Sequence, residues 1–270
     1  MAAKFDKSEF LWEGNPYSHI NNVIAVASGK GGVGKSLVTS LLASACAKDG
    51  NQTAIMDADI TGPSIPKSFG LSGQLTGIEG VGLEPAESEL GVKVVSMNLI
   101  LEEEDAPVVW RGPVVAGVLQ QFYNEVDWGQ VDYMFVDMPP GTGDVPLTVY
   151  QSLPVTGIVV VTTPQDLVQL IVKKAFNMAK MMEVPILGVI ENMSYLECPD
   201  CGRKIDVFGK SKAQEIADEL GVPVLATLPI NPAVTELVDA GRVEAAEVPQ
   251  IEEAFAQIKA AIAAQDVDAQ

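Results

Sequence analysis

Residues 27–38 read ASGKGGVGKSLV, and this short stretch decides the fold. Positions 29 to 36 fit the pattern G-x-x-x-x-G-K-[ST] of a phosphate-binding loop, between a β-branched run and a helical pattern as that loop requires. Its glycines allow the backbone to curl until its amides face an anion, and the start of the following helix adds a partial positive charge. The stretch therefore predicts a phosphate site between a buried strand and a helix.

The side chains of this loop supply chemistry that the backbone lacks. Lys35 is expected to reach the β- and γ-phosphates of a nucleotide, and the Ser36 hydroxyl is expected to bind Mg²⁺. The candidate nucleotide-binding positions are Gly29, Lys30, Gly31, Gly32, Val33, Gly34, Lys35, Ser36 and Leu37.

Outward from the loop, short β-branched runs recur along the chain. They are apolar on both faces, which is typical of strands covered by helices on each side. Helical patterns follow the loop and recur at 165–182, 211–220 and 249–264. This alternation predicts an α/β fold of the P-loop NTPase type, with a doubly wound, mostly parallel sheet and helices on both faces. The predicted strands are 23–27, 53–57, 92–96, 133–137, 157–161, 186–190 and 222–228.

Two segments interrupt the alternation. The glycine-rich stretch 72–85 predicts a hairpin or an exposed loop, and the acidic run 102–105 predicts a solvated loop. Since no repeat or linker divides the sequence, we expect one domain over 1–270. Within it, we expect an N-terminal extension at 1–20 and a cysteine-containing metal loop at 192–209.

The composition limits the partners of the chain. Its 270 residues include 17 basic and 36 acidic side chains, for a net charge of −19. A surface this acidic repels nucleic-acid phosphates and anionic lipid heads, so neither nucleic acid nor a membrane is expected as a partner. No apolar run approaches the roughly 20 residues of a membrane helix, and the start of the chain does not resemble a signal peptide. The composition predicts a soluble cytoplasmic protein.

A phosphate loop also needs an acidic side chain on a neighbouring strand, which holds Mg²⁺ directly or through water. The candidates are Asp57 and Asp59 in MDAD, and Asp137 in FVDMPPGTGD. Asp137 ends an apolar strand at the carboxyl edge of the sheet, where ligands of open α/β folds bind. The amide of Gly141 is then a candidate to meet the γ-phosphate. The alternative at each aspartate is a residue that only caps a turn.

Lys30 is a second cation in the loop, and the pattern does not require it. A loop lysine is commonly just solvated. A positive charge near the β–γ bridge nevertheless favours phosphoryl transfer. Because Lys30 precedes two glycines, we expect its side chain to point away from its own nucleotide, toward one held by a second copy of the chain.

Cys198 and Cys201 form a C-x-x-C pair followed by glycine, a knuckle that brings two thiolates onto one soft metal. A redox pair is the alternative, although such a pair normally opens a helix, which Pro199 and Gly202 disfavour. Zinc and iron–sulfur suit the spacing equally. Two thiolates are half of a tetrahedral site, and Cys46 is expected in the core. The remaining ligands are therefore expected from the same pair of a second subunit.

KGGVGKS resembles the deviant Walker A loop of the family that contains MinD, ParA and the nitrogenase iron protein. In that family the early lysine crosses a dimer interface to the partner's ATP, which implies that Lys30 acts in trans as a catalytic residue beside Lys35. The resemblance also makes Asp59 a catalytic switch I residue that positions the attacking water, and it assigns residues 137–144 to switch II.

Further motifs narrow the resemblance, over about residues 20 to 240, to the Mrp/ApbC branch of iron–sulfur cluster carrier ATPases. In this branch the cysteine pair holds a [4Fe–4S] cluster between subunits. Asn192 matches the residue that recognises adenine, with a strand-end turn residue as the alternative. Leu37 departs from the family, in which a hydroxyl residue usually follows Ser36. The motifs are SGKGGVGKS, DADITGPSIP, VWRGP, WGQVDYMFVDMPPGTGD, TTPQDL, GVIENMSY and CPDCG.

The resemblance implies an ATP-hydrolysing homodimer that carries a [4Fe–4S] cluster to apo iron–sulfur proteins and uses ATP and Mg²⁺. Two other functions stay open. One is a nucleotide-switched ATPase with a structural zinc at the dimer interface, and the other is a MinD- or ParA-like positioning ATPase. The latter needs a basic surface or a cationic amphipathic helix, whereas the last helical pattern carries Glu252 and Glu253 against Lys259.

Overall fold

The computed structural model describes residues 9–60, 62–101, 112–165, 174 and 176–268. These residues build an eight-stranded sheet in the order β12-β9-β8-β1-β7-β2-β6-β5. Only β5 runs antiparallel to its neighbour, and all other pairs are parallel. The strands are β1 (His19–Ser28), β2 (Thr53–Asp57), β5 (Ala86–Glu87), β6 (Lys93–Val95), β7 (Gln130–Asp137), β8 (Val155–Thr162), β9 (Ile186–Glu191) and β12 (Val224–Thr227).

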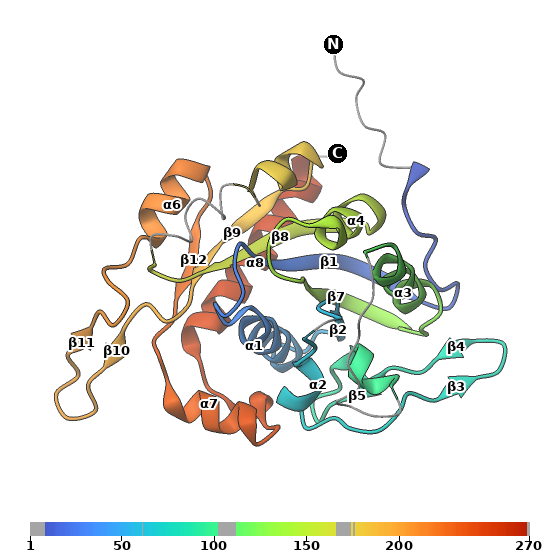
Figure 1. Ribbon diagram of the computed structural model, residues 1–270, viewed down its shortest axis with the longest axis horizontal. Helices are drawn as coiled ribbons and strands as arrows, with labels where there is room; N and C mark the ends of the chain where they lie inside the picture. Colours follow the sequence, from blue (N-terminus) through green and yellow to red (C-terminus); the bar gives the residue numbers. More distant parts are fainter. Residues whose placement is uncertain (1–8, 61, 102–111, 166–173, 175, 269–270) are drawn as a thin grey trace, which may run out of the picture.

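Helices cover both faces of the sheet (Figure 1). They are α1 (Lys35–Lys48), α2 (Ile65–Ser68), α3 (Gly112–Asn124), α4 (Asp144–Ser152), α6 (Ala213–Leu220), α7 (Pro232–Asp239) and α8 (Pro249–Asp268), with 3₁₀ turns at Met97–Leu99 and Val243–Ala245. Two small hairpins project from the main sheet. One pairs β3 (Gly77–Ile78) with β4 (Gly82–Leu83), and the other pairs β10 (Leu196–Glu197) with β11 (Lys204–Ile205).

The central strand β1 divides the core into two layers because successive side chains of a strand point to opposite faces. Val23 and Ala25 pack in the layer that includes Leu119 of α3 and Tyr150 of α4. Ile24 and Val26 pack in the layer formed by α1 and α8. Burial on both faces explains why the strand sequences lack polar alternation.

The predicted α/β fold is confirmed, and each predicted strand corresponds to a strand of the main sheet. The stretch 72–85 contains the β3–β4 hairpin, as one of its two interpretations predicted. Helices α6 and α8 match two predicted helices. Of the predicted helix 165–182, residues 176–181 are helical, while part of it and the whole acidic run 102–105 lie outside the described residues.

The segment before β1 is attached to the fold. Trp12 donates its backbone amide to Ser152 O at 2.8 Å, and Asn15 donates its side-chain amide to Val81 O at 3.0 Å. Asn15 is buried, and Trp12 packs against the ring of Tyr123. The described part of the predicted extension therefore forms a strap across α3, α4 and the β3–β4 region.

Among the helices that the structure describes, none combines the length and the apolarity that a membrane crossing needs. The long helix α8 instead packs its apolar side into the core through Ile251, Phe255 and Ile258.

Candidate nucleotide site and cysteine hairpin

The phosphate loop joins β1 to α1 at the carboxyl edge of the parallel strands, the edge where open α/β sheets bind ligands. Gly34, at the start of α1, has a φ of 81°, in the left-handed region that favours glycine. A Cβ atom at this position would lie 2.2 Å from the side-chain nitrogen of Asn192. Conformation and space therefore both demand glycine where the loop meets the end of β9.

Asp137, the last residue of β7, is the centre of the polar contacts behind the loop. Its Oδ2 atom accepts hydrogen bonds from Lys35 Nζ at 2.7 Å and from Ser36 Oγ at 2.6 Å, while Oδ1 accepts one from Thr39 Oγ1 at 2.7 Å. The carboxylate is fully buried, so these bonds offset the cost of removing it from water. The strand-end position predicted for Asp137 thus brings it to Lys35 and Ser36.

Thr39 was not predicted as part of this cluster. It lies one helical turn after Lys35, whose carbonyl also accepts from the Thr39 hydroxyl at 3.0 Å. The spacing of four residues on α1, which places both side chains on the same face, is the signal that could have found it.

The two aspartates after β2 differ in their surroundings. Asp57 accepts hydrogen bonds from Ser96 Oγ at 2.9 Å and from the Asp59 amide at 3.1 Å. It pairs in register with Asp137 on the neighbouring strand, and burial, followed by the negative charge of Asp137, raises the pKa of Asp57 to about 8. Asp59 reaches back into the site, with its Oδ2 atom 3.9 Å from Lys35 Nζ. Asp59 is therefore the partly exposed carboxylate on the loop side, while Asp57 is structural.

Gly141 and Lys30 flank the loop. Gly141 has a φ of 90° and donates its amide to Ser28 O at 2.9 Å, which attaches the turn after β7 to the end of β1. Lys30 has an exposed side chain, and its carbonyl accepts from Ser28 Oγ at 3.0 Å. The predicted residues Lys35, Ser36, Asp59, Asp137 and Gly141 thus gather around one loop, and Lys30 faces solvent.

A cavity of about 320 Å³ opens beside the first turns of α1. Leu37 and Leu41 form one wall, and Asn192 and Met193 after β9 form another. Asn192 is buried and donates its side-chain amide to Val33 O at 3.0 Å. Glu197, inside the predicted cysteine loop, also lines the cavity. The remaining lining residues, which the sequence motifs did not indicate, are Leu228, Pro229, Ile230, Asn231, Val234, Thr235, Glu247, Val248, Pro249 and Gln250.

The cysteine pair lies at the turn of the β10–β11 hairpin. The Cys198 amide donates to Arg203 O and the Gly202 amide to Cys198 O, each at 2.9 Å, so the turn is a tight knuckle as predicted. Both thiols are free, with Cys198 half-buried and Cys201 exposed. Hydrogen bonds from the Asp200 amide, then from the amide and side chain of Cys201, lower the pKa of Cys198. The knuckle therefore favours a thiolate, the form that binds metals.

Cys46 lies elsewhere, fully buried in the core on α1, as expected. Burial raises the pKa of its thiol to about 12, and Thr53 Oγ1 contacts its sulfur at 3.1 Å. In the part of the chain that the structure describes, no three His, Cys, Asp or Glu side chains gather closely enough to hold a metal ion. One chain therefore presents the pair without further ligands among these residues.

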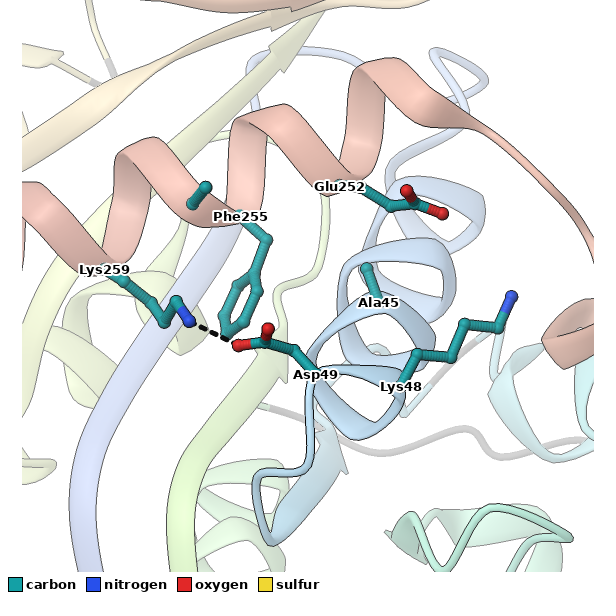
Figure 2. Close-up of a pocket in the computed structure, with 7 residues that line it drawn as sticks. Ala45, Lys48, Asp49, Glu252, Phe255 and Lys259 are labelled. Atoms are coloured by element: carbon teal, nitrogen blue, oxygen red, sulfur yellow. Dashed lines mark hydrogen bonds and ion pairs between the residues drawn. The ribbon is translucent and has the colours of Figure 1, made fainter.

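A second hollow, of about 250 Å³, lies between α8 and the far end of α1 (Figure 2). Lys259 forms an ion pair there with Asp49 and lies 5.3 Å from the centre of the Phe255 ring. Helix α1 rises about 1.5 Å per residue, so the residues of α1 that line this hollow lie about 15–20 Å along the helix from Lys35. The hollow does not contribute to the nucleotide site.

Comparison with known proteins agrees with this geometry. A family model described as ParA, NUBPL iron-transfer P-loop NTPase, matches residues 19–263. An iron-sulfur cluster carrier protein from Clostridium perfringens is 50% identical over 238 residues, which cover 86% of this chain and 84% of the relative. A nucleotide-binding protein from Archaeoglobus fulgidus, solved in complex with ADP, is 44% identical with a TM-score of 0.78, over 86% of this chain and 91% of that one.

More distant structures share only the fold. MinD in its complex with MinC from Aquifex aeolicus aligns with a TM-score of 0.61 at 20% identity, over 88% of this chain and 96% of that one. The resemblance carried by KGGVGKS and CPDCG is thereby confirmed. Because the family model spans the phosphate loop, Asp137 and the cysteine hairpin alike, the chain belongs to the ParA/NUBPL iron-transfer family of P-loop NTPases.

Proposed function

We propose that this protein is an ATP-hydrolysing, homodimeric carrier that binds a [4Fe–4S] cluster and transfers it to apo-proteins. The observation that carries the proposal is that the phosphate loop and the cysteine hairpin line the same cavity. The cavity beside the phosphate loop is lined by Leu37, directly after the loop, and by Glu197, directly before Cys198. A nucleotide seated there contacts the hairpin that presents the thiols.

The phosphate end of the site suits a magnesium–nucleotide complex. Ser36 Oγ and Asp137 Oδ2 lie 2.6 Å apart, and hydroxyl and carboxylate oxygens are the donors that Mg²⁺ prefers. We assign Ser36, Asp137 and, through water, Asp59 to the ion, which neutralises charge on the β- and γ-phosphates when bound. Lys35 is the loop's own cation. Nucleotide phosphates compete with Asp137 for its ammonium group, which lies 2.7 Å from that carboxylate.

Hydrolysis further needs a positioned water and a group that responds to the γ-phosphate. Asp59 is assigned to the water, since its carboxylate lies on the loop side of Lys35 at 3.9 Å. Gly141 is assigned to the γ-phosphate, because its turn is hydrogen-bonded to the strand that enters the loop. Lys30 is assigned to the nucleotide of a second copy, and its exposed side chain is free to extend outward.

The cavity suits the nucleoside. Asn192 offers an amide at its inner wall, while Leu37, Met193 and Ile230 offer apolar surface for a base. Leu37, at the position where relatives are expected to carry a hydroxyl, thus adds an apolar contact instead of a polar one. The chain is expected to bind ATP in spite of this departure.

The cluster requires two chains. A cubane cluster takes four thiolates, and each chain offers Cys198 and Cys201, so a two-fold axis through the cluster completes the ligand set. The end of the hairpin and the turn after it also expose apolar side chains, at Ile205, Val207 and Phe208. Burial of such a patch between two copies supports a dimer contact around the cluster.

A positioning ATPase on a membrane is disfavoured by the last helix, because α8 packs Ile251, Phe255 and Ile258 into the core and exposes the acidic side chains of Glu252 and Glu253. Structural zinc is the stronger rival, since a thiolate pair binds either metal centre.

The deciding experiment is anaerobic reconstitution with iron and sulfide, followed by incubation with an apo [4Fe–4S] enzyme. We expect a broad visible absorption band, and we expect the recipient's activity to appear as the band leaves the carrier. Cys198→Ala and Cys201→Ala should show neither, while Cys46→Ala should match the wild type. A colourless protein that holds zinc under these conditions would establish the rival.

A further inference from the structure

The cysteine hairpin is anchored at both of its ends by one side chain, that of Glu191. This residue ends β9 and is fully buried. One carboxylate oxygen accepts from the hydroxyl of Ser194, where the chain leaves the sheet. The other accepts from the Lys212 amide at 2.9 Å, where the chain returns just before α6. A single carboxylate thus closes the loop that carries Cys198 and Cys201.

The next residue along the chain faces the nucleotide site. Asn192 lines the cavity beside α1 and donates to Val33 O in the phosphate loop. Glu191 and Asn192 therefore direct adjacent side chains to the two functional regions of the protein, the hairpin and the nucleotide loop.

The turn between them is held in an uncommon conformation. Met193 has a φ of 56°, in the left-handed region that unbranched side chains adopt only when surrounding contacts hold them there. Asn192 Oδ1 accepts from the Met193 amide at 2.9 Å, and Ser194 returns to Glu191 through its hydroxyl. The left-handed backbone at Met193 depends on these few contacts, so we expect the turn to shift when one of them changes.

The hairpin's first strand is also tied to the cavity wall. The Ser194 amide donates to Leu228 O at 2.9 Å, and the Ile230 amide donates to Tyr195 O at 2.7 Å. A base that engages Asn192 and Ile230 therefore acts on both sides of this turn. Glu191, which accepts from the Lys212 amide, connects this turn to the point where the chain returns from the hairpin.

We infer that Glu191 is a positioning residue that couples nucleotide occupancy to the geometry of the Cys198–Cys201 pair within one chain. Its role in cluster release rests on the proposed function, whereas the coupling itself does not. Linkage requires reciprocity, so loading of the cysteine pair changes nucleotide affinity by the same factor as the nucleotide changes the affinity for the cluster.

The test follows the thiols of the full-length, cluster-free protein by alkylation with N-ethylmaleimide and mass spectrometry, with and without saturating Mg–ADP. In the wild type, ADP should change the alkylation rate of the pair by about fivefold, the low end of typical couplings. In Glu191→Ala this change should disappear while the Kd for ADP stays within about threefold of wild type. Glu191→Gln should restore it, because an amide can accept from the Lys212 amide and donate to Ser194.

Glu215→Gln is the matched control, since it removes the same charge from an exposed position on α6 and should behave as wild type. If Glu191→Ala does not fold, Ser194→Ala removes one of the two hydrogen bonds that the Glu191 carboxylate accepts and should reduce the coupling in part. An ADP effect of wild-type size in a folded Glu191→Ala protein, or no effect of ADP in the wild type, would overturn the inference.

Cluster loading gives the second readout. In the wild type, the Kd for ADP should differ between the loaded and cluster-free forms, and in Glu191→Ala the two values should coincide. A wild type that takes up no cluster but retains ADP-dependent alkylation would remove the carrier function and leave the coupling intact. A wild type that carries a cluster but shows no ADP-dependent alkylation would support the carrier function and overturn the coupling.

Discussion

The side-chain amide of Asn192 lies 3.0 Å from the backbone carbonyl of Val33 and donates a hydrogen bond to it. This contact joins the end of β9 to the phosphate loop across 159 residues of sequence. Gly34 leaves the space for it, because a Cβ at that position would overlap the amide nitrogen. The phosphate loop and the strand that leads to the cysteine hairpin are therefore in direct contact within a single chain.

Asn192→Ala should weaken ATP binding. The substitution leaves Val33 O without its buried donor and removes an amide from the cavity wall, at a cost of about 1–2 kcal/mol, or about 5- to 30-fold in Kd. Isothermal titration with ATP and with GTP measures both affinity and base selectivity, and the preference for ATP should shrink. Asn21→Ala, exposed near the start of β1, is the control. Unchanged affinity and selectivity would exclude Asn192 from base recognition.

Lys35→Ala should abolish ATP hydrolysis. The ammonium group lies 2.7 Å from Asp137 and 3.9 Å from Asp59, in the loop that we propose binds the nucleotide phosphates. Removal of one preorganised charge contact to the transferring group lowers kcat by about 10²–10³-fold. A phosphate-release assay compares it with Lys180→Ala, which changes an exposed helical lysine. Turnover of Lys35→Ala at the wild-type rate would place the ATP site elsewhere.

Lys30 should act across the dimer interface. Lys30→Ala and Asp59→Ala chains, each inactive alone, are mixed and allowed to exchange subunits. In a heterodimer, one site then has both its own Asp59 and the partner's lysine, so activity should recover to about a quarter of wild type when half of the dimers are mixed. Absence of recovery, with heterodimers shown by native mass spectrometry, would assign Lys30 to its own nucleotide.

Two of the three thiols should react in the native protein, and the third should react only after denaturation. Cys46 is buried and its pKa is about 12, so at pH 8 only about one thiol in 10⁴ is ionised. Cys198 and Cys201 lie at the surface of the hairpin, and the pKa of Cys198 is lowered. Titration with a thiol reagent before and after addition of guanidinium checks the count. A third fast thiol in the native state would contradict the placement of Cys46.

The parts of the fold that the sequence predicted are those with local signals. The β-branched runs predicted seven of the eight strands of the main sheet, because burial on both faces leaves no polar alternation, whereas the two-residue edge strand β5 was not predicted. Helices α3 and α4 were not predicted. Each begins at a glycine with a proline close behind, at Gly112-Pro113 and at Gly143-Asp144-Val145-Pro146, a combination that occurs both in turns and at helix starts. In both segments, packing of apolar side chains against the sheet accompanies the helix, and that packing cannot be read from the local residues.

For the candidate site too, the sequence predicts only the residues that have a local signal. Lys35, Ser36 and Asp137 follow from a motif and a strand end, and the structure brings them together. The cavity beside α1 has no such signal, because its walls come from segments between 37 and 250 that meet only in the folded chain. Glu191 could have been identified from the sequence, because it is an acidic residue at the end of an apolar strand. A carboxylate buried at such a position requires hydrogen-bond partners.

A cluster shared between two chains is tested most directly by the iron and sulfide content of the anaerobically reconstituted protein, with its mass determined by native mass spectrometry. Each chain presents two surface thiols, and a cubane cluster needs four thiolates. The shared site predicts about four iron and four sulfide atoms per dimer, none on the monomer, and none on Cys198→Ala dimers. A full cluster on a strictly monomeric protein would contradict the account.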